Sequence, residues 1–301
     1  MEFYDLAIAY KWIYDRELTE LIEKMFQKNG LKTFIIGVHN LNEIIEKVKN
    51  DELSFTAILD RASDEDESFV ELAKLITKKN TYIINEYEKI ETAIDKAKMH
   101  IKLEKENFPL PFTIIAPKYE ITPKLSISKR NMQKLKIPFV IKPAYYSGGG
   151  DGVVTDATTM QEIEHSRKIN YDDRYLIQKK IYPKNINGRR VWLRVFWFFN
   201  EVFPVWWSDE THIYEEISDE ETLSQNLIKM KDYTTKLAEI TGLDYFSSEF
   251  TLDEKDNLFL IDYVNDQCDL RMKSVHHDGV PDNIVVKFVE KMFEKVNSLK
   301  S

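Results

Sequence analysis

Apolar and polar positions follow two alternating periods along the first hundred residues. Short apolar runs that suit strands are followed by stretches in which apolar residues recur every three to four positions, as on one face of a helix. Leu18, Ile22, Met25 and Phe26 show the helical spacing, and Gly30 follows them as a stop signal. This alternation predicts a parallel sheet covered on both faces. The predicted strands are 4–10, 32–38, 54–60 and 81–85, and the predicted helices are 15–30, 40–50 and 66–80.

The pattern changes after residue 88. A single long helix is predicted over 88–108, and prolines after it mark a linker into a strand. An aromatic run over 189–208, broken by Asn-Glu, predicts a β-hairpin, and 245–266 predicts a second one. The predicted fold is therefore a parallel α/β lobe followed by α+β lobes. The expected boundaries are 1–100, 101–180 and 181–301.

Composition and charge narrow the class of protein. The chain has 301 residues, of which 43% are hydrophobic and 31% charged, which is typical of a globular protein. The formal net charge of −9 argues against non-specific nucleic-acid binding, because such binding depends on cationic contacts to phosphates. Cys268 is the one cysteine, so a reducing compartment is expected, and no run of apolar residues is long enough to span a membrane. We therefore expect a soluble cytoplasmic protein with neither a nucleic-acid nor a membrane partner.

The stretch from Ile137 to Asp156, IPFVIKPAYYSGGGDGVVTD, places one lysine at the end of an apolar run and follows it with a glycine-rich loop. The loop fits neither the P-loop spacing nor the dinucleotide-binding fingerprint, since it leads into another strand and not into a helix. Two antiparallel strands are expected to flank it. Backbone N–H groups of such a loop can form an anion site, and Lys142 beside it would strengthen the grip on a polyphosphate. A flexible hairpin tip and a solvated lysine are the alternatives.

Acidic residues in the second predicted hairpin suggest a magnesium site. Glu249 lies in its first strand and Asp262 in its second, both among apolar neighbours where an unpaired acid would be costly. Mg²⁺ prefers carboxylate and amide oxygens, which two facing strands can supply. The acids of the turn between the strands are expected to be solvated.

These segments, in this order, resemble the ATP-grasp superfamily. The Lys142-Pro143 pair and the glycine-rich loop are similar to the family's phosphate-binding element, and Asp95-Lys96 to its earlier lysine, with Lys98 as the other candidate. The segment YLIQKKI is similar to the hinge that holds adenine. The resemblance implies two ATP-grasp lobes with the nucleotide between them. The implied nucleotide-binding residues are Lys96, Lys142, Ser147, Gly148, Gly149, Gly150, Gly152, Gln178, Lys179 and Ile181.

The resemblance also implies metal and substrate residues. Glu249, Asp262 and Asn265 would hold Mg²⁺, although the family's usual Glu-x-Asn ending is here Asp262-Tyr-Val-Asn265, one residue longer. Either a bulge brings Asn265 to the metal, or Asp266 or Gln267 replaces it. Arg194 would stabilise an acyl phosphate, with Arg190 in reserve, and Arg271 would bind the substrate.

The implied activity is that of an ADP-forming carboxylate–amine ligase that uses ATP and Mg²⁺. A small-molecule or peptide carboxylate would be activated as an acyl phosphate, and an amine or similar nucleophile would then displace phosphate. The alternatives are a small-molecule kinase on the same fold and an interaction module, either nucleotide-binding or nucleotide-free. The sequence gives no clear oligomer signal, and a homodimer is implied only by the resemblance, since family members are often dimers. The sequence specifies neither the carboxylate nor the nucleophile.

Overall fold

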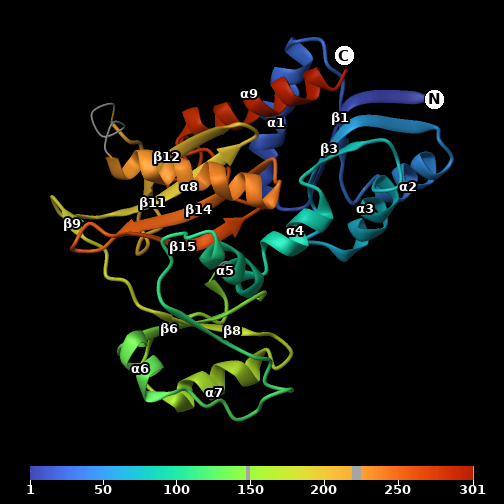
Figure 1. The fold of residues 1–301 in the computed structure, drawn as a ribbon. Helices are drawn as coiled ribbons and strands as arrows, with labels where there is room; N and C mark the ends of the chain where they lie inside the picture. The colour runs from blue at the N-terminus through green and yellow to red at the C-terminus, as the bar shows by residue number, and fades with distance from the viewer. Residues whose placement is uncertain (147–149, 219–224, 301) are drawn as a thin grey trace. The chain divides into compact units, whose positions relative to one another are not determined.

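The computed structural model describes residues 1–146, 150–218 and 225–300. Figure 1 shows the helices and strands of these residues. Contacts between residues divide the chain into two compact units. The first comprises Met1–Ile90, Val195–Ser247 and Asp266–Ser301, and the second comprises Glu91–Arg194 and Ser248–Asn265. The three-lobe division expected from the sequence stays a prediction.

The first unit contains the parallel sheet that the sequence pattern predicts. Its order is β2-β1-β3-β4, and every pairing within it is parallel. Helices cover both faces, so the predicted architecture of this region is confirmed. The elements are β1 (Glu2–Tyr10), α1 (Arg16–Lys28), β2 (Thr33–Ile36), α2 (Leu41–Lys49), β3 (Leu53–Arg61), α3 (Val70–Ile76), β4 (Tyr82–Ile84) and α9 (Asp282–Ser298), with one-turn 3-10 helices at Ile13–Asp15 and Glu67–Phe69.

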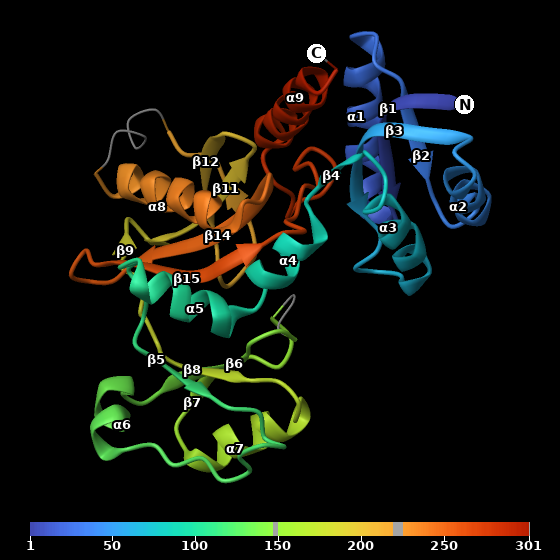
Figure 2. The ribbon, with the colours of Figure 1, turned by 45° about the vertical axis from the view of Figure 1, so that its right-hand side comes forward.

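Alternating side chains of β1 build two separate cores. Leu6 and Ile8 face a cluster with residues of α1 and α9, whereas Ala7 and Ala9 face a cluster with residues of α2 and α3. This follows from the period of two in a strand, which sends neighbouring side chains to opposite faces. Figure 2 shows α1 and α9 side by side, in agreement with their contacts.

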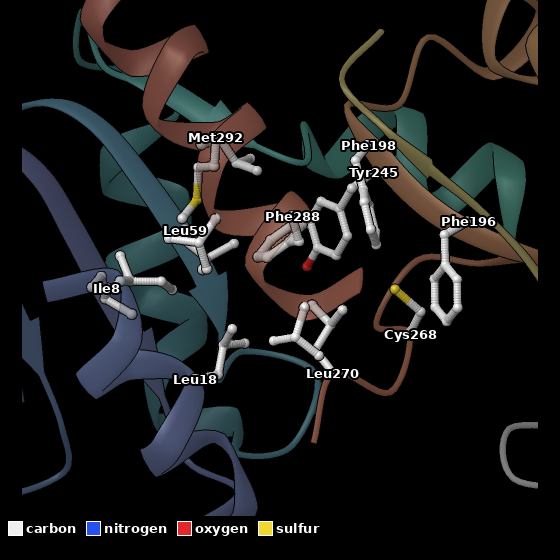
Figure 3. Close-up of a cluster of buried hydrophobic side chains, with 14 of the residues drawn as sticks. Ile8, Leu18, Leu59, Phe196, Phe198, Tyr245, Cys268, Leu270, Phe288 and Met292 are labelled. Carbon is white, nitrogen blue, oxygen red and sulfur yellow. The ribbon is translucent and has the colours of Figure 1, made fainter. Parts of the chain in front are cut away.

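The core on the α9 side extends to residues far along the chain (Figure 3). Phe288 of α9 lies in the middle of the labelled side chains, with its ring centroid 5.1 Å from that of Tyr245 and 5.2 Å from that of Phe198. Cys268 is buried in the same cluster, where it fills space as a small packing residue. Close packing of this kind makes the cluster sensitive to any loss of volume.

A five-stranded sheet in the order β13-β12-β11-β14-β15 contains both predicted hairpins. The division into units falls within β11 and β14. Helix α8 packs against β12. The bounds are β11 (Trp192–Phe198), β12 (Glu201–Trp207), β13 (Tyr214–Glu215), α8 (Gln225–Thr241), β14 (Tyr245–Leu252) and β15 (Leu258–Asn265).

The second unit holds an antiparallel four-stranded sheet in the order β5-β8-β6-β7. Figures 1 and 2 show α6 and α7 on the same side of this sheet, where Leu135 and Ile163 join its core. Thr159 and Glu162 form a capping box that fixes the start of α7. The elements are α5 (Lys96–Lys105), β5 (Thr113–Ala116), α6 (Lys129–Leu135), β6 (Phe139–Pro143), β7 (Val154–Ala157), α7 (Met160–Ile169), β8 (Tyr175–Lys179), β9 (Asn185–Ile186) and β10 (Arg189–Arg190).

The single helix predicted over 88–108 is wrong. The chain forms α4 (Tyr87–Ala93) and then α5, with Asp95 between them in an extended conformation at ψ 95°. The Asp95 side chain accepts the backbone N–H groups of Ala97 and Lys98 and so starts a new helix. A short acidic side chain can offer the backbone this alternative to a continuing helix.

No helix among the described residues has the length and apolar character needed to cross a membrane.

Candidate functional site

Lys96 and Asp262 form the first charge pair of the candidate site. Lys96 is the first residue of α5, because the Asp95 cap places the start of the helix there. Its Nζ lies 3.3 Å from Oδ1 of Asp262 on β15, and its side chain is only 13% exposed. Asp95 and Lys96 therefore have different roles. Asp95 starts the helix, and Lys96 forms an ion pair with Asp262 of the second hairpin.

Lys142 reaches the same strand from β6. It is buried, its Nζ donates a hydrogen bond of 2.9 Å to the carbonyl oxygen of Ile261, and it lies 5.5 Å from the ring centroid of Tyr263. Burial lowers the pKa of the Lys142 ammonium to about 8, against the opposing effect of the Asp262 carboxylate. The apolar residues of β6 that precede Lys142 thus place its ammonium where little water reaches it.

Glu249 on β14 is held by two residues of the neighbouring strand β11. Arg194 donates from Nη2 to Oε1 of Glu249, and Trp192 donates from Nε1 to Oε2 over 3.2 Å. Arg194 and Glu249 are 12% and 14% exposed. A guanidinium buried to this degree normally needs such a partner. Arg190, the reserve candidate, ends the short strand β10 and lies outside β11.

Asp262 lies among the positive charges of this unit. Burial alone would raise its pKa, but the charges of Lys96 and Lys142 outweigh burial and hold the pKa of Asp262 below its usual value. The carboxylate is therefore ionised at neutral pH. With Lys142 protonated, three cations and two carboxylates leave one positive charge in excess, which favours a polyanionic ligand.

The glycine-rich loop joins two antiparallel strands, as predicted. Gly150 and Gly152 have φ angles of 88° and 68°, which strongly favour glycine, and a Cβ at Gly152 would meet Pro143 at 3.0 Å. These glycines let the chain fold back closely over the Lys-Pro pair. Ser147, Gly148 and Gly149, also predicted to bind phosphate, lie outside the described residues.

Two residues that the sequence analysis missed anchor the start of the loop. Asp173 accepts the backbone N–H of Tyr145 at 2.8 Å, and Arg174 donates from Nη2 to both carboxylate oxygens of Asp95. The backbone N–H of Lys96 donates to the carbonyl oxygen of Ala144. These bonds tie the start of α5 to the start of the loop. The available signal was the Asp173-Arg174 pair directly before β8.

The residues predicted to form the adenine hinge differ in their burial and in their hydrogen bonds. Gln178 is buried, and its Nε2 donates to Oγ1 of Thr113 over 3.0 Å. The backbone N–H of Lys179 donates to the carbonyl oxygen of Phe112. Ile181 is half-buried just beyond β8. Contacts of Gln178, Lys179 and Ile181 with a base stay a prediction.

Asn265 and Gln267, which follow Asp262 in the sequence, lie in different surroundings. Asn265 is the last residue of β15. Gln267, an alternative to it, accepts from the hydroxyl of Tyr245 and donates to the carbonyl oxygen of Asp60, both at 3.0 Å. Its amide is therefore engaged within the first unit, whereas the choice between Asn265 and Asp266 for the metal stays a prediction.

Arg271, the predicted substrate residue, also belongs to the first unit. Its guanidinium donates to both Asp269 and Asp278 and faces the rings of Trp12 and Tyr14. Two carboxylates already compensate its charge, so a substrate anion would have to compete with them. Its role toward a substrate stays a prediction.

Glu249 and Asp262 fit a magnesium ion that is bound together with phosphate. Oδ1 of Asp262 is buried and is paired with Nζ of Lys96 at 3.3 Å without hydrogen-bond geometry, so a metal ion at this oxygen would share it with that ammonium. Among all the residues that the structure describes, no group of three or more His, Cys, Asp and Glu side chains lies close enough together to hold a metal ion by itself. Mg²⁺ is commonly held by one or two carboxylates plus phosphate oxygens. The donor set therefore suits Mg²⁺ only with such a ligand.

Comparison with solved structures identifies the fold. The macrocyclase MdnC bound with precursor peptide MdnA from Microcystis aeruginosa MRC matches with a TM-score of 0.66 at 11% identity, over 96% of this chain and 99% of that one. The ATP-grasp ligase PsnB, complexed with minimal precursor, Mg and ADP, matches at 0.64 and 13%, over 97% and 98%. This chain has the ATP-grasp fold. D-alanine–D-alanine ligase from Bacillus anthracis complexed with ATP matches equally well, at 0.66 and 14%, over 98% and 97%.

The likeness to these ATP-grasp structures lies in the fold, because the identities are low. No family model matches the sequence, and no curated protein matches it either. The ATP-grasp fold nevertheless agrees with the order of motifs in the sequence, from Lys96 through Lys142 to Glu249 and Asp262.

Proposed function

We propose that this protein is an ATP- and Mg²⁺-dependent ligase that joins a carboxylate to an amine or a similar nucleophile and forms ADP. The observation that carries the proposal is the grouping of Lys96, Lys142 and Arg194 around Asp262 and Glu249. This set of charges suits a nucleotide polyphosphate with its metal. Solved ATP-grasp ligases of the same fold support it, since structures of PsnB and of the alanine ligase hold ADP with Mg and ATP respectively.

The residues divide into three roles in the proposed reaction. Lys96 and Lys142 bind phosphate oxygens, and backbone N–H groups of the glycine-rich loop from Ser147 to Gly152 cover them. Glu249, Asp262 and Asn265 hold Mg²⁺, which supplies charge neutralisation on the phosphates when it is bound. Arg194 stabilises the charge that develops at the reacting carboxylate.

The proposed reaction has two steps. An oxygen of the substrate carboxylate attacks the γ-phosphorus of ATP, the bond from that phosphorus to the β-phosphate oxygen breaks, and ADP leaves. The nucleophile then attacks the acyl carbon and loses a proton, and inorganic phosphate leaves. The protein's contribution is positioning and charge stabilisation.

Similar structures support two substrate classes. MdnC and PsnB were solved with precursor peptides, which supports a peptide carboxylate. The alanine ligase supports a small-molecule substrate instead. We therefore keep both classes, together with the cytoplasmic location and the homodimer, as predictions.

Nucleotide binding is the first test. A non-hydrolysable ATP analogue with Mg²⁺, at about 100 times its Kd, should stabilise the protein by about 2.7 kcal/mol, which is visible as a raised midpoint of thermal unfolding. Lys142→Ala should remove most of that shift. No shift in the wild type at millimolar analogue would overturn the ligase and the kinase and favour an interaction module that binds no nucleotide.

ADP release during a screen of carboxylates with amines tests the reaction itself. Glu249→Gln and Asp262→Asn should each reduce turnover at least about a hundredfold, because each removes a charge that the metal needs. Turnover that needs two substrates and yields inorganic phosphate supports the ligase. Turnover with a single acceptor that becomes phosphorylated would replace the ligase with the kinase.

A further inference from the structure

The ammonium of Lys142 rests on an aromatic ring. Its Nζ lies 5.5 Å from the ring centroid of Tyr263, and Tyr263 is only 1% exposed. A cation within about 6 Å of a ring face is attracted by the ring quadrupole, and the attraction is larger where water is excluded. The ring therefore stabilises one position of the ammonium, next to its hydrogen bond to the carbonyl oxygen of Ile261.

Hydrogen bonds hold both the phenol hydroxyl and the backbone of Tyr263. Its hydroxyl lies 2.6 Å from Nδ1 of His100, and the Tyr263 carbonyl oxygen accepts from Oγ of Ser248 at 2.5 Å. His100 follows Lys96 by one helical turn on α5, so the same helix face meets Asp262 and Tyr263. The orientation of the phenol is thus set by the helix that carries the first lysine.

His100 is suited to accept the phenol proton. Burial, with a smaller effect of Lys142, lowers the pKa of His100 to about 4, so the imidazole is neutral at physiological pH. A neutral imidazole accepts through Nδ1 when its proton is on Nε2. It also adds no second positive charge that would push Lys142 away from the ring.

We propose that Tyr263, held by His100, is a positioning residue for Lys142 that fixes its ammonium for binding a nucleotide phosphate oxygen. This inference rests on the proposed function. A carboxylate beneath Lys142 would also hold it, but it would neutralise the charge that has to meet the phosphate. An aromatic ring attracts the ammonium without carrying a formal charge. It also restricts the long lysine side chain before the nucleotide binds, so less conformational freedom is lost on binding.

The alternative is that Tyr263 only fills the core. A double-mutant cycle separates the two roles, with binding of a non-hydrolysable ATP analogue and Mg²⁺ measured by calorimetry. Tyr263→Leu keeps an apolar side chain but removes the ring, and should weaken binding about 3- to 30-fold. Tyr263→Phe keeps the ring and should stay within about threefold of the wild type. In a Lys142→Met background, Tyr263→Leu should have no further effect.

Equal losses in the Lys142 and Lys142→Met backgrounds would overturn the positioning role, because the effect of Tyr263 would not act through Lys142. An equal loss for the Phe and Leu variants would overturn the role of the ring. Absence of analogue binding by the wild type would instead overturn the proposed function, and this inference with it. The two failures are therefore distinguishable.

Fluorinated phenylalanines at position 263 cover the case in which Tyr263→Leu does not fold. They keep the shape of the ring while weakening its negative face. Affinity for the analogue should fall stepwise with the number of ring fluorines in the Lys142 protein and stay constant with Lys142→Met. A constant affinity in both proteins would overturn the proposal.

Discussion

At the scale of single residues, Lys96, Lys142 and Arg194 of the candidate site differ in how their charge is compensated. Lys96 and Arg194 each contact a carboxylate directly, whereas Lys142 hydrogen-bonds a neutral carbonyl oxygen. Burial therefore acts on Lys142 with less compensation and lowers its pKa from the usual 10.5 to about 8. A phosphate would supply the missing charge, so nucleotide binding and protonation of Lys142 are expected to be coupled.

This coupling predicts a pH dependence of binding. Above pH 8 the free protein holds fewer protons at Lys142 than the complex does, so raising the pH opposes binding. Affinity for the ATP analogue with Mg²⁺ should be constant from about pH 6.5 to about pH 7.5. Above pH 8 it should fall by up to about tenfold per pH unit.

Lys142→Met is the control for this pH profile. Its weaker affinity should show no fall above pH 8, as measured by calorimetry in matched buffers. If the variant keeps the slope of the wild type, another group titrates and the assignment to Lys142 is wrong.

At the scale of elements, the break between α4 and α5 places Lys96 at a helix start. Asp95 both caps α5 and pairs with Arg174, which precedes β8. The pair is partly shielded, with Asp95 10% and Arg174 29% exposed. One acidic side chain thus joins a helix start to the sheet that carries the glycine-rich loop.

Substitutions at Asp95 should separate its two functions. Asp95→Asn keeps a good capping side chain and loses the charge pair with Arg174, whereas Asp95→Ala loses both. We expect Asp95→Ala to lower the free energy of unfolding by about 1 kcal/mol more than Asp95→Asn does, as measured by urea denaturation. Equal effects would mean that the cap contributes nothing.

At the scale of the whole molecule, each unit has a hydrophobic core of its own. In the first unit, the cluster around Phe288 joins α9 to residues of β11 and β14 that lie far away in sequence. A second core lies on the opposite face of the parallel sheet. Helices on both faces explain why the strands of this unit are rich in apolar residues.

Phe288→Ala tests the weight of that cluster. Loss of a fully buried ring leaves a cavity and should lower the free energy of unfolding by about 3–5 kcal/mol, seen as a lower midpoint of thermal unfolding. The neighbouring Lys287→Ala removes only an exposed ion pair with Glu290 and should cost less than about 0.5 kcal/mol. Similar shifts for the two variants would contradict this account of the core.

Most helices and strands could be predicted from the sequence, because each one depends on a local pattern. The period of two in β1, the helical spacing in α1 and the broken aromatic run of the first hairpin could be recognised within a short window. The Lys142-Pro143 pair, the glycines and the acids of the second hairpin indicated polyphosphate chemistry for the same reason. The break at Asp95 was not predicted. The residues around it are good helix formers, and their pattern does not show that the Asp95 side chain will cap a new helix.

Which charges meet follows from the tertiary structure and not from any local pattern. Lys142 and Ile261 are 119 positions apart, and nothing in the local pattern specifies that Lys142 rests on Tyr263 or that His100 holds that ring. Which strands lie next to each other, and which faces they present, depends on packing among distant segments. The pKa of Lys142 follows from that packing, because burial and neighbouring charges exist only once the chain has folded.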